Sequence, residues 1–279
     1  MKYKLICIDM DGTLLNSRKK ISNENKESIK KAKEKGVVVA ISTGRIYNNA
    51  AFYADYIDLK APIIAANGAI IIDKDGGEIF KGVIGYDTSL KILNILKKYK
   101  LTPHFHTRNA IYSGSILQKL LGYLFSARGI PVDYKISLKS IAGIDAWKRL
   151  LNEKEEEILK CITFSFNLKK INRAKEELRK IPEIEVTSSY PLNIEINAAK
   201  VSKGNGVKIL SEHLGIKREE VICVGDNEND ISMIEYAGLG VAMGNASASI
   251  KEKADFVTTS NDNSGVGYAI RKFILEEKI

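Results

Sequence analysis

The ten residues Lys4–Thr13 (KLICIDMDGT) decide the fold of this chain. They begin with a continuous apolar run, a pattern typical of a strand that helices cover on both faces of a parallel sheet. Two carboxylates, Asp9 and Asp11, follow where the strand ends, and Gly12 allows a sharp turn directly after them. Open α/β sheets bind ligands at the carboxyl ends of their strands. The stretch therefore predicts a buried strand with a functional site at its end, although the same D-x-D-G pattern also occurs as a plain turn.

Four further apolar runs end in polar or glycine-rich turns. Together with the first run, the predicted strands cover Lys4–Met10, Val37–Thr43, Ile63–Ala66, Val221–Asp226 and Gly240–Met243. The predicted helices between them cover Glu24–Lys35, Lys203–Leu214 and Ile231–Ala237. Because strands and helices alternate, we expect right-handed βαβ units and a Rossmann-like, doubly wound parallel sheet of the α/β class.

The middle of the chain has a different pattern. The runs Lys160–Asn167 and Ile184–Ser188 alternate apolar and polar side chains, as in a sheet with one lightly covered face, which is usually antiparallel. The helical patterns around them cover Leu90–Tyr99, Ile116–Ala127 and Ile171–Lys180. We therefore predict an inserted α+β domain at residues 84–189, within a core formed by residues 1–83 and 190–279.

Composition indicates a globular protein and excludes several classes. Hydrophobic residues make up 44% of the 279 residues, which argues against wholesale disorder. No apolar run reaches the roughly 18–20 residues of a membrane helix, and the chain opens on a strand pattern instead of a basic and then apolar leader. Cys7, Cys161 and Cys223 form no CxxC pair, so we expect reduced, buried thiols. These features predict a cytoplasmic protein that does not bind a membrane.

The net charge of +9 is concentrated in the predicted insertion. Residues 84–190 carry 19 basic and 11 acidic side chains, whereas the rest of the chain carries 24 and 23. An overall excess of lysine does not by itself indicate a nucleic-acid partner, and we expect none. A basic insertion instead favours small anionic substrates through long-range attraction, which added salt weakens.

A second acidic cluster, Gly225–Asp230 (GDNEND), follows another predicted strand. An acidic helix N-terminus that favours the helix dipole would account for this segment alone. In a parallel sheet, however, its strand can lie beside the first strand, which would bring Asp9, Asp226 and Asp230 together. So few carboxylates cannot enclose Ca²⁺, and they favour Mg²⁺, which is typically held by a few carboxylates, waters and a phosphate.

Two other segments supply what an anion needs. Ser42–Arg45 (STGR) follows a predicted strand with hydroxyls, turn amides and a cation, which are the usual groups around phosphate oxygens. Lys203 stands at the start of a predicted helix, where its charge opposes the helix dipole. A negative partner explains a lysine at this position better than helix stability does.

In this order, DxDGT at residues 9–13, STGR at 42–45, KG at 203–204 and GDNEND at 225–230 resemble the haloacid dehalogenase superfamily. The closest resemblance is to its Cof-type phosphatases, which insert a large α+β cap into the core. The resemblance covers nearly the whole chain, because Asn67–Ala69 and Asn261–Val266 are also similar to that subfamily. Ala198–Lys200 departs from the pattern, and the cap matches only in length and alternation.

The resemblance implies roles for individual residues. Asp9 would be the nucleophile, and Asp11 the general acid and base. The residues implied to bind phosphate are Met10, Thr43, Gly44, Lys203 and Asn229. The residues implied to bind Mg²⁺ are Asp9, Asp11 (through its backbone carbonyl), Asp226 and Asp230.

The expected activity is Mg²⁺-dependent hydrolysis of small phosphorylated metabolites, sugar phosphates first, through an aspartyl-phosphate. A phosphotransferase or mutase resembling the phosphomannomutases is the main alternative. A signalling receiver domain would leave the insertion unexplained, and an idle binding module would not need every catalytic position filled. His104 and His106 would share one face of a strand, where they either contact a ligand or face solvent.

Overall fold

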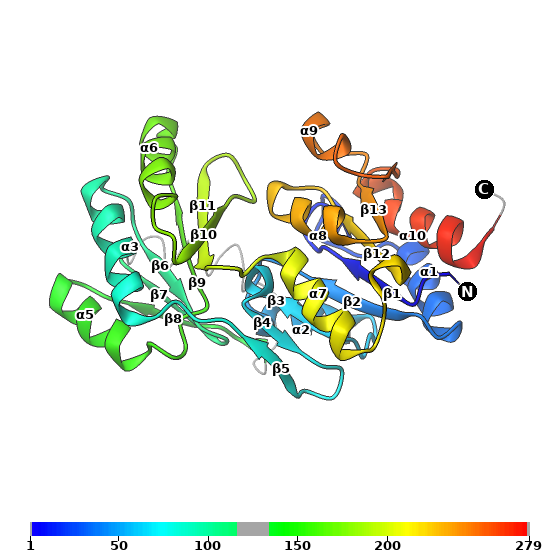
Figure 1. Ribbon diagram of the computed structural model, residues 1–279, viewed down its shortest axis with the longest axis horizontal. Coiled ribbons are helices and arrows are strands. Elements are labelled where there is room, and N and C mark those ends of the chain that lie inside the picture. Colours follow the sequence, from blue (N-terminus) through cyan, green and yellow to red (C-terminus); the bar gives the residue numbers. More distant parts are fainter. Residues whose placement is uncertain (1, 116–133, 278–279) are drawn as a thin grey trace. The chain divides into compact units, whose positions relative to one another are not determined.

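A computed structural model describes residues 2–115 and 134–277 of the chain, so the predicted helix at 116–127 lies outside the described residues. The chain forms two compact units (Figure 1). Unit 1 consists of Met1–Gly44, Tyr53–Phe80 and Ser202–Ile279. Unit 2 consists of Arg45–Phe52 and Lys81–Val201.

An eight-stranded sheet forms the centre of unit 1. Its strands follow the order β14 (Phe256–Val257), β13 (Leu239–Ala242), β12 (Val221–Gly225), β1 (Leu5–Ile8), β2 (Val38–Ser42), β3 (Ile63–Ala65), β4 (Ile70–Ile72) and β5 (Glu78–Lys81). β1 is buried along its length and runs parallel to both neighbours, with Leu5 opposite Val221 on one side and Val38 on the other. The predicted parallel sheet is therefore confirmed for the strands that adjoin β1.

One edge of this sheet differs from the prediction. β4 runs antiparallel to β3, so the sheet is mixed rather than wholly parallel. The chain reverses through η1 (Ala66–Gly68), where Asn67 has φ 62° and Gly68 has φ 97°. These left-handed conformations allow a tight return that a crossover helix would not permit.

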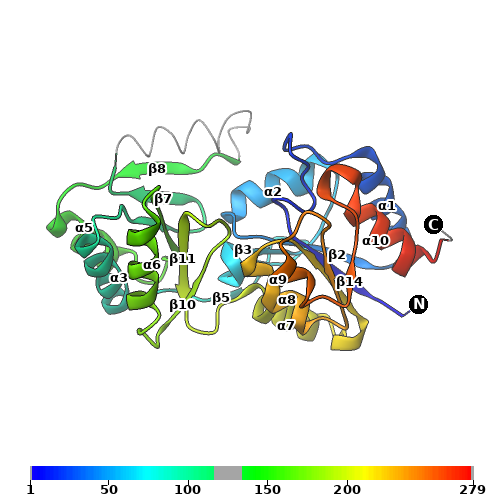
Figure 2. The ribbon, with the colours of Figure 1, turned by 90° about the horizontal axis from the view of Figure 1, so that it is seen from above.

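Helices cover both faces of the sheet, as a doubly wound fold requires. The helical elements of unit 1 are α1 (Asn23–Glu34), η1 (Ala66–Gly68), α7 (Lys203–His213), η3 (Arg218–Glu220), η4 (Glu228–Asp230), α8 (Ile231–Tyr236), α9 (Ala248–Lys251), η5 (Asn261–Asn263), α10 (Gly265–Ile270) and η6 (Arg271–Leu275). α1 packs against α10 and α7 packs against α8, and Figure 2 shows the sheet between these pairs. α2 (Tyr47–Tyr56) has residues in both units. None of the helices in the described residues combines the length and hydropathy that a bilayer crossing requires.

Unit 2 has its own sheet of six strands. Their order is β10 (Ile184–Thr187), β11 (Asn193–Ala198), β9 (Lys160–Phe164), β6 (His104–His106), β7 (Ala110–Ser113) and β8 (Ser137–Ser140). The four pairings from β10 to β7 in this order are antiparallel. β7 pairs with β8 in parallel. Unit 2 extends past the predicted boundary at residue 189, because β11 pairs with both β9 and β10.

Three helices pack on one face of the second sheet: α3 (Tyr86–Lys98), α5 (Ile144–Glu153) and α6 (Leu168–Leu178). Trp147 of α5 lies against Phe105 of β6, with ring centroids 5.5 Å apart. Cys161 of β9 belongs to the same buried cluster. The alternating pattern of the sequence thus separates an apolar face, which the helices cover, from a face of different chemistry.

Candidate active site

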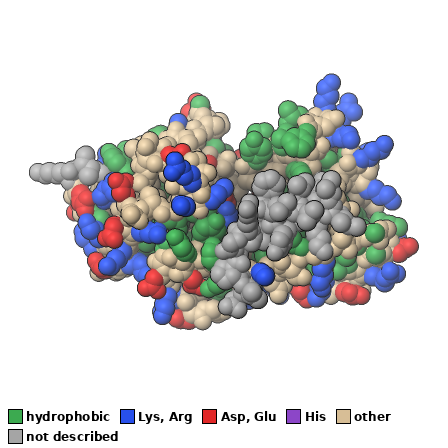
Figure 3. Space-filling model, turned by 180° about the vertical axis from the view of Figure 1, so that it is seen from behind, with side chains coloured by type: hydrophobic (Ala, Val, Ile, Leu, Met, Phe, Trp, Pro, Cys, Tyr) green, Lys and Arg blue, Asp and Glu red, His purple; other side chains and the backbone are tan. Residues whose placement is uncertain are grey.

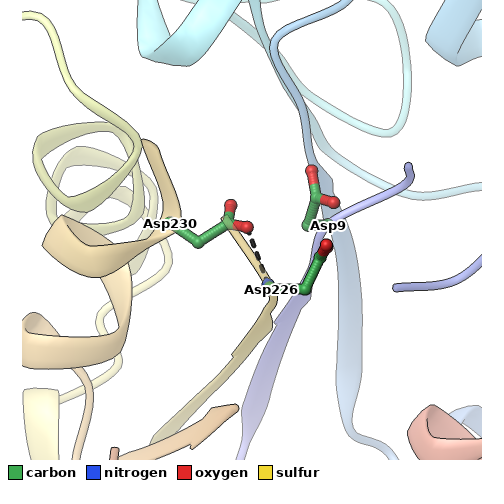
Figure 4. Close-up of side chains that lie close together, drawn as sticks. All are labelled: Asp9, Asp226 and Asp230. Atoms are coloured by element: carbon green, nitrogen blue, oxygen red, sulfur yellow. Dashed lines mark hydrogen bonds between the residues drawn. The ribbon is translucent and has the colours of Figure 1, made fainter. Parts of the chain in front are cut away.

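Neighbouring strands bring the two acidic motifs of unit 1 together. Asp9 follows β1 and donates its backbone N–H to Val224 of β12 at 3.0 Å, while Asp226 follows β12 itself. Asp9, Asp226 and Asp230 are all buried, and each offers a carboxylate oxygen within 4.8 Å of the others (Figure 4). The predicted convergence of three carboxylates from both ends of the chain is confirmed.

The turn after β1 wraps around Asp226. Gly12 has φ +81°, and a Cβ atom at this position would overlap the Asp226 carboxylate. Thr13 is completely buried, and its hydroxyl donates to Asp226 Oδ1 at 2.7 Å. The glycine and the threonine of the DGT turn therefore fix a carboxylate that is more than two hundred residues away in the sequence.

The loop that follows β12 holds its own acidic groups in place. Asp230, at the end of η4, accepts the backbone N–H groups of Asp226 and Asn227 on Oδ2, both at 2.9 Å. The side-chain amide of Asn227 donates to Asp226 Oδ2, also at 2.9 Å. Because Asp230 uses Oδ2 for the loop, its other oxygen points into the site.

Lys203 is the buried cation of the site. Its Nζ lies 2.6 Å from Asp9 Oδ1 and 2.5 Å from Asp230 Oδ1, and 1% of its side chain is exposed. It occupies the first position of α7, and Ser202 caps this helix by accepting the N–H of Asn205 at 3.1 Å. The sequence predicts a negative partner for a lysine at this helix start. In the structure its partners are the carboxylates of Asp9 and Asp230.

The charges of the site do not balance. Burial, followed by the nearby Asp230, raises the pKa of Asp9 well above its ordinary value, although the Lys203 ammonium opposes this. Burial also raises the pKa of Asp226 to about 7. For Lys203, burial acts to lower the pKa, but the carboxylates of Asp230 and Asp9 outweigh it and raise the pKa overall. Three carboxylates around one ammonium leave negative charge that a cation would stabilise.

The donor set fits a hard divalent cation. Three buried carboxylates that converge within 4.8 Å repel one another, and this repulsion would be relieved by a metal ion bound to their oxygens. All the donors are oxygens, which Mg²⁺ prefers and which exclude the soft metals that favour thiolates. Asp9, Asp226 and Asp230 are the residues that could hold it.

Asp11 stands at a more open position than the buried carboxylates. Its side chain is 39% exposed and accepts a hydrogen bond from Lys19 Nζ at 2.8 Å. Although Asp11 is only two residues from Asp9, it lies further along the turn that follows β1, where it is less buried. An accessible carboxyl group is suited to exchange protons with water or with a substrate oxygen.

The residues predicted to bind phosphate lie in segments that hydrogen bonds connect. Thr43 is buried after β2, and its backbone N–H donates to Ile64 of β3 at 2.8 Å. Its carbonyl accepts the N–H of Asn67 at 3.0 Å, and the Asn67 side chain accepts from Asn229 Nδ2 at 3.1 Å. This chain of contacts connects the ends of β2 and β3 to η4, which also carries Asp230. Met10 is buried in the turn after β1, and Gly44 is half-buried directly after Thr43.

Four residues near the site received no role from the sequence: Thr13, Lys19, Asn67 and Asn227. The signal for Asn67 was present, because an Asn-Gly pair after a strand indicates a left-handed turn. Thr13 and Asn227 adjoin motif residues, but their partners depend on the packing of β1 beside β12. Lys19 lies in a loop without a motif, so only the structure shows its contact with Asp11.

Comparison of this chain with known proteins shows the family to which it belongs. The sequence model of the haloacid dehalogenase-like hydrolases matches residues 6–270. The chain belongs to this family. It is 34% identical over 272 residues to a 5-amino-6-(5-phospho-D-ribitylamino)uracil phosphatase of Bacillus subtilis, YcsE, a match that covers 98% of this chain and 96% of the relative.

Solved structures of haloacid dehalogenase-like proteins agree with the sequence comparison. A haloacid dehalogenase-like hydrolase from B. subtilis superposes with a TM-score of 0.86 at 32% identity, covering 97% of this chain and 100% of that one. The subclass IIB sugar phosphatase BT4131 superposes with a TM-score of 0.80 at 27% identity, covering 97% and 98%. The predicted resemblance and fold class are confirmed, and the protein is a haloacid dehalogenase-like phosphatase.

Proposed function

We propose that the protein is a Mg²⁺-dependent phosphatase that hydrolyses small phosphorylated metabolites through an aspartyl-phosphate on Asp9. The observation that carries the proposal is the position of the Asp9 carboxylate. It is 2.6 Å from the Lys203 ammonium and converges with Asp226 and Asp230 on a space suited to a cation. A carboxylate in such surroundings meets a phosphate dianion with its charge compensated.

Mg²⁺ would be held by the carboxylates of Asp9, Asp226 and Asp230, together with the backbone carbonyl of Asp11. When bound, it supplies positive charge that polarises the phosphoryl oxygens and offsets their repulsion from the carboxylates. Thr13 and Asn227 keep Asp226 oriented toward this place through its two oxygens. Such supporting hydrogen bonds typically matter about 10-fold to 100-fold in metal affinity or activity.

The substrate phosphate would bind to the backbone of Met10 and Gly44, the hydroxyl of Thr43, the amide of Asn229 and the ammonium of Lys203. The contact between Asn229 and Asn67 holds that amide in a fixed direction. Lys203 would then divide its three N–H donors between phosphate and the carboxylates that already bind it. Holding the phosphate in this way aligns phosphorus with the Asp9 oxygen for in-line attack.

The chemistry needs two displacements at phosphorus. In the first, an Asp9 oxygen forms a bond to phosphorus as the bond to the leaving oxygen breaks, and Asp11 gives its proton to that oxygen. In the second, Asp11, now a carboxylate, takes a proton from a water molecule whose oxygen attacks phosphorus. The acyl-phosphate bond breaks, and Asp9 and inorganic phosphate are released. Dividing one hard displacement into two is the benefit of a covalent intermediate.

We further propose that unit 2, for which the sequence predicts residues 84–189, acts as a cap domain that selects the organic part of the substrate. Sugar phosphates are the first candidates, and the structural relative BT4131 is named a sugar phosphatase. The relative YcsE is named for a substrate with a phosphorylated ribityl chain, which likewise joins phosphate to a hydroxyl-bearing carbon chain. Three free and buried cysteines support the proposal of a reducing, cytoplasmic location.

The competing assignment is a phosphomutase, which transfers the phosphoryl group to a sugar hydroxyl instead of to water. One experiment separates the two: purified protein with Mg²⁺ is incubated with p-nitrophenyl phosphate and with a panel of sugar phosphates, and inorganic phosphate is measured. A phosphatase releases phosphate with repeated turnover from several of these compounds. Isomerised sugar phosphate without release of phosphate would contradict the proposal.

A further inference from the structure

The loop of residues 16–20 follows the DGT turn of unit 1 and closes on itself. The Asn16 N–H donates to the carbonyl of Lys20 at 3.0 Å, and the Lys19 N–H donates to the carbonyl of Asn16 at 2.9 Å. The Asn16 side chain accepts the N–H groups of Arg18 and Lys20 on Oδ1, at 3.0 Å and 2.9 Å. Four hydrogen bonds to Asn16 therefore fix the backbone of this loop.

A distant segment of the same unit also holds the loop. The Ser17 N–H donates to Asp262 Oδ1 at 2.8 Å, although the two residues are 245 positions apart in the sequence. Asn261 Nδ2 donates to the carbonyl of Leu15 at 3.0 Å, directly before the loop. Asn261 and Asp262 both belong to η5. The conformation of the loop thus depends on contacts in which the Lys19 side chain takes no part.

The backbone of Lys19 adopts a conformation that suits glycine. Its φ is 57°, in the left-handed region, where a residue with a Cβ atom is strained and glycine is not. Residues held in this way gather at functional sites, where the surrounding structure keeps them in place. The contacts of Asn16 and Ser17 supply that surrounding structure. The loop therefore places a lysine where the backbone alone favours glycine.

The Lys19 side chain reaches Asp11. Its Nζ lies 2.8 Å from Asp11 Oδ1, and the two side chains are 61% and 39% exposed. Ion pairs between such exposed side chains contribute little to stability, because water and salt screen them. Stability of the loop therefore explains neither the strained backbone nor the contact. What the contact does determine is the direction of the Asp11 carboxyl group.

The direction of that group matters for proton transfer. A general acid or base must present one oxygen to the reacting atom within hydrogen-bond reach. Burial and the Lys203 ammonium hold Asp9 in place, whereas Asp11 lies in a more open part of the turn after β1. With Oδ1 bound to Lys19, the direction of Oδ2 is set as well. A misplacement of about 1 Å can cost about 100-fold in rate.

We propose that Lys19 is a positioning residue for Asp11, which it holds so that Oδ2 gives the proton to the leaving oxygen and later takes one from water. The assignment rests on the proposed phosphatase function, in which Asp11 is the general acid and base. Lys19 itself touches no reacting atom and transfers no proton. Its removal therefore affects only the steps in which Asp11 exchanges a proton.

The first test varies the leaving group. The measured quantity is kcat/KM with Mg²⁺ for phenyl phosphate and for p-nitrophenyl phosphate. The two compounds are similar in shape, but the nitro group stabilises the departing phenolate, so that its oxygen needs less help from an acid. Lys19→Met is expected to lower kcat/KM about 10-fold to 100-fold for phenyl phosphate and at most about 3-fold for p-nitrophenyl phosphate.

Two matched variants separate the contact from the charge of the loop. Lys20→Met removes an exposed lysine next to Lys19 and should leave both values of kcat/KM unchanged. Lys19→Arg should bring kcat/KM for phenyl phosphate back to within about 3-fold of wild type, because a guanidinium also donates N–H groups to a carboxylate. Equal losses in Lys19→Met and Lys20→Met would show that only the charge of the loop matters, and would overturn the role of Lys19.

Lys19→Gly distinguishes positioning from folding. Glycine adopts a φ of 57° without strain, so the Tm of Lys19→Gly should be at least that of Lys19→Met. Its kcat/KM for phenyl phosphate should nevertheless fall as far as that of Lys19→Met, because the ammonium is gone. If Lys19 served only the backbone of the loop, Lys19→Gly would keep wild-type activity.

Two results overturn the role of Lys19 while the proposed function stands. The first is an equal loss of kcat/KM on the two aryl phosphates in Lys19→Met, and the second is wild-type activity in Lys19→Gly. A different result concerns the proposed function itself. If wild-type protein with Mg²⁺ released phosphate from neither aryl phosphate nor from any sugar phosphate, the proposed function would be wrong, and the role of Lys19 would fall with it.

Discussion

Each unit buries a lysine against carboxylates, but the two lysines stand in opposite charge environments. Lys203 of unit 1 binds two of three converging carboxylates, whereas Lys160 of unit 2 binds the single carboxylate of Glu195. Both side chains are almost completely buried. In the first cluster the carboxylates outnumber the ammonium, whereas in the second, among the residues that the structure describes, one ammonium binds one carboxylate.

This difference shows how similar residues serve different chemistry. A cluster with excess charge attracts a cation and stabilises the charge that moves in a phosphoryl transfer. In a balanced cluster each charge already has its partner within the protein, so that removal of one partner leaves the other buried and unpaired. The comparison therefore predicts that metal, catalysis and stability respond differently when the two clusters are changed.

The largest effect is expected from Asp9→Asn. The amide cannot attack phosphorus, and turnover should fall by about 10⁵-fold to 10⁶-fold, as for other enzymes that lose a nucleophile. The measurement is phosphate release from p-nitrophenyl phosphate, with the circular dichroism spectrum as a control of folding. An Asp9→Asn enzyme that keeps a tenth of the activity would remove Asp9 from the nucleophilic role.

Removal of metal should affect the cluster of unit 1 around Asp9, Asp226 and Asp230, and not the Lys160–Glu195 pair of unit 2. Chelation is expected to lower activity by about 10³-fold, since a bound cation supplies several kcal/mol to the transition state, and Mg²⁺ should restore it. Mg²⁺ should also raise the Tm, because it binds the folded state alone. Asp226→Asn is expected to abolish this rise in Tm, and Glu195→Gln to leave it intact. Equal effects of the two variants would contradict the comparison.

Asp11→Asn should reduce activity less than Asp9→Asn does. Loss of general acid and base help costs at least about 10²-fold. The loss should be smaller for p-nitrophenyl phosphate, whose leaving group needs little protonation, than for a sugar phosphate. A rate that is unchanged for both substrates would deny Asp11 the proton transfer.

The neutral cluster predicts a change in stability. Lys160→Met leaves the buried Glu195 charge without its partner and should lower the free energy of unfolding by about 3–5 kcal/mol. Lys160→Met/Glu195→Met should recover most of that loss, because no charge remains buried. Urea titration of both variants measures the difference. A double variant less stable than the single one would show that the pair is not balanced as described.

The smallest effect concerns salt. Residues 84–190 carry the excess of basic side chains, and Figure 3 shows Lys and Arg dispersed over one face of the molecule together with Asp and Glu. Because most of these charges within the described residues are exposed, kcat/KM for an anionic substrate should fall only a few-fold between about 0.05 M and 0.5 M salt. Stopped-flow or steady-state assays at constant Mg²⁺ measure the slope. Independence from salt would exclude electrostatic attraction by these residues.

Much of unit 1 could be predicted because its local patterns agree with the fold. Continuous apolar runs placed β1, β2, β3, β12 and β13 to within about two residues, and polar residues at their ends marked the site. The Asn67-Gly68 pair indicated a turn, but the antiparallel strand β4 after it was not predicted, although Ala66, Asn67 and Gly68 all have positive φ there. A three-residue strand has no periodicity of its own.

In unit 2 the sequence indicated alternation, but not the partners of each strand. His104 and His106 were correctly placed on one face, yet nothing in the sequence associated them with Lys160 or Glu195. That association needs the register of β6, β9 and β11, which long-range pairing determines. Ion pairs between strands far apart in the chain are therefore visible only in the structure.

The left-handed turn at Gly12 has a practical consequence. Only the hydrogen atom of a glycine side chain fits at this position, because a methyl group would overlap the Asp226 carboxylate. Mutant libraries that vary the residues proposed to bind phosphate should keep Gly12 unchanged. A Gly12→Ala variant should lose affinity for magnesium while it keeps its fold, and would serve as a scaffold that does not bind the metal.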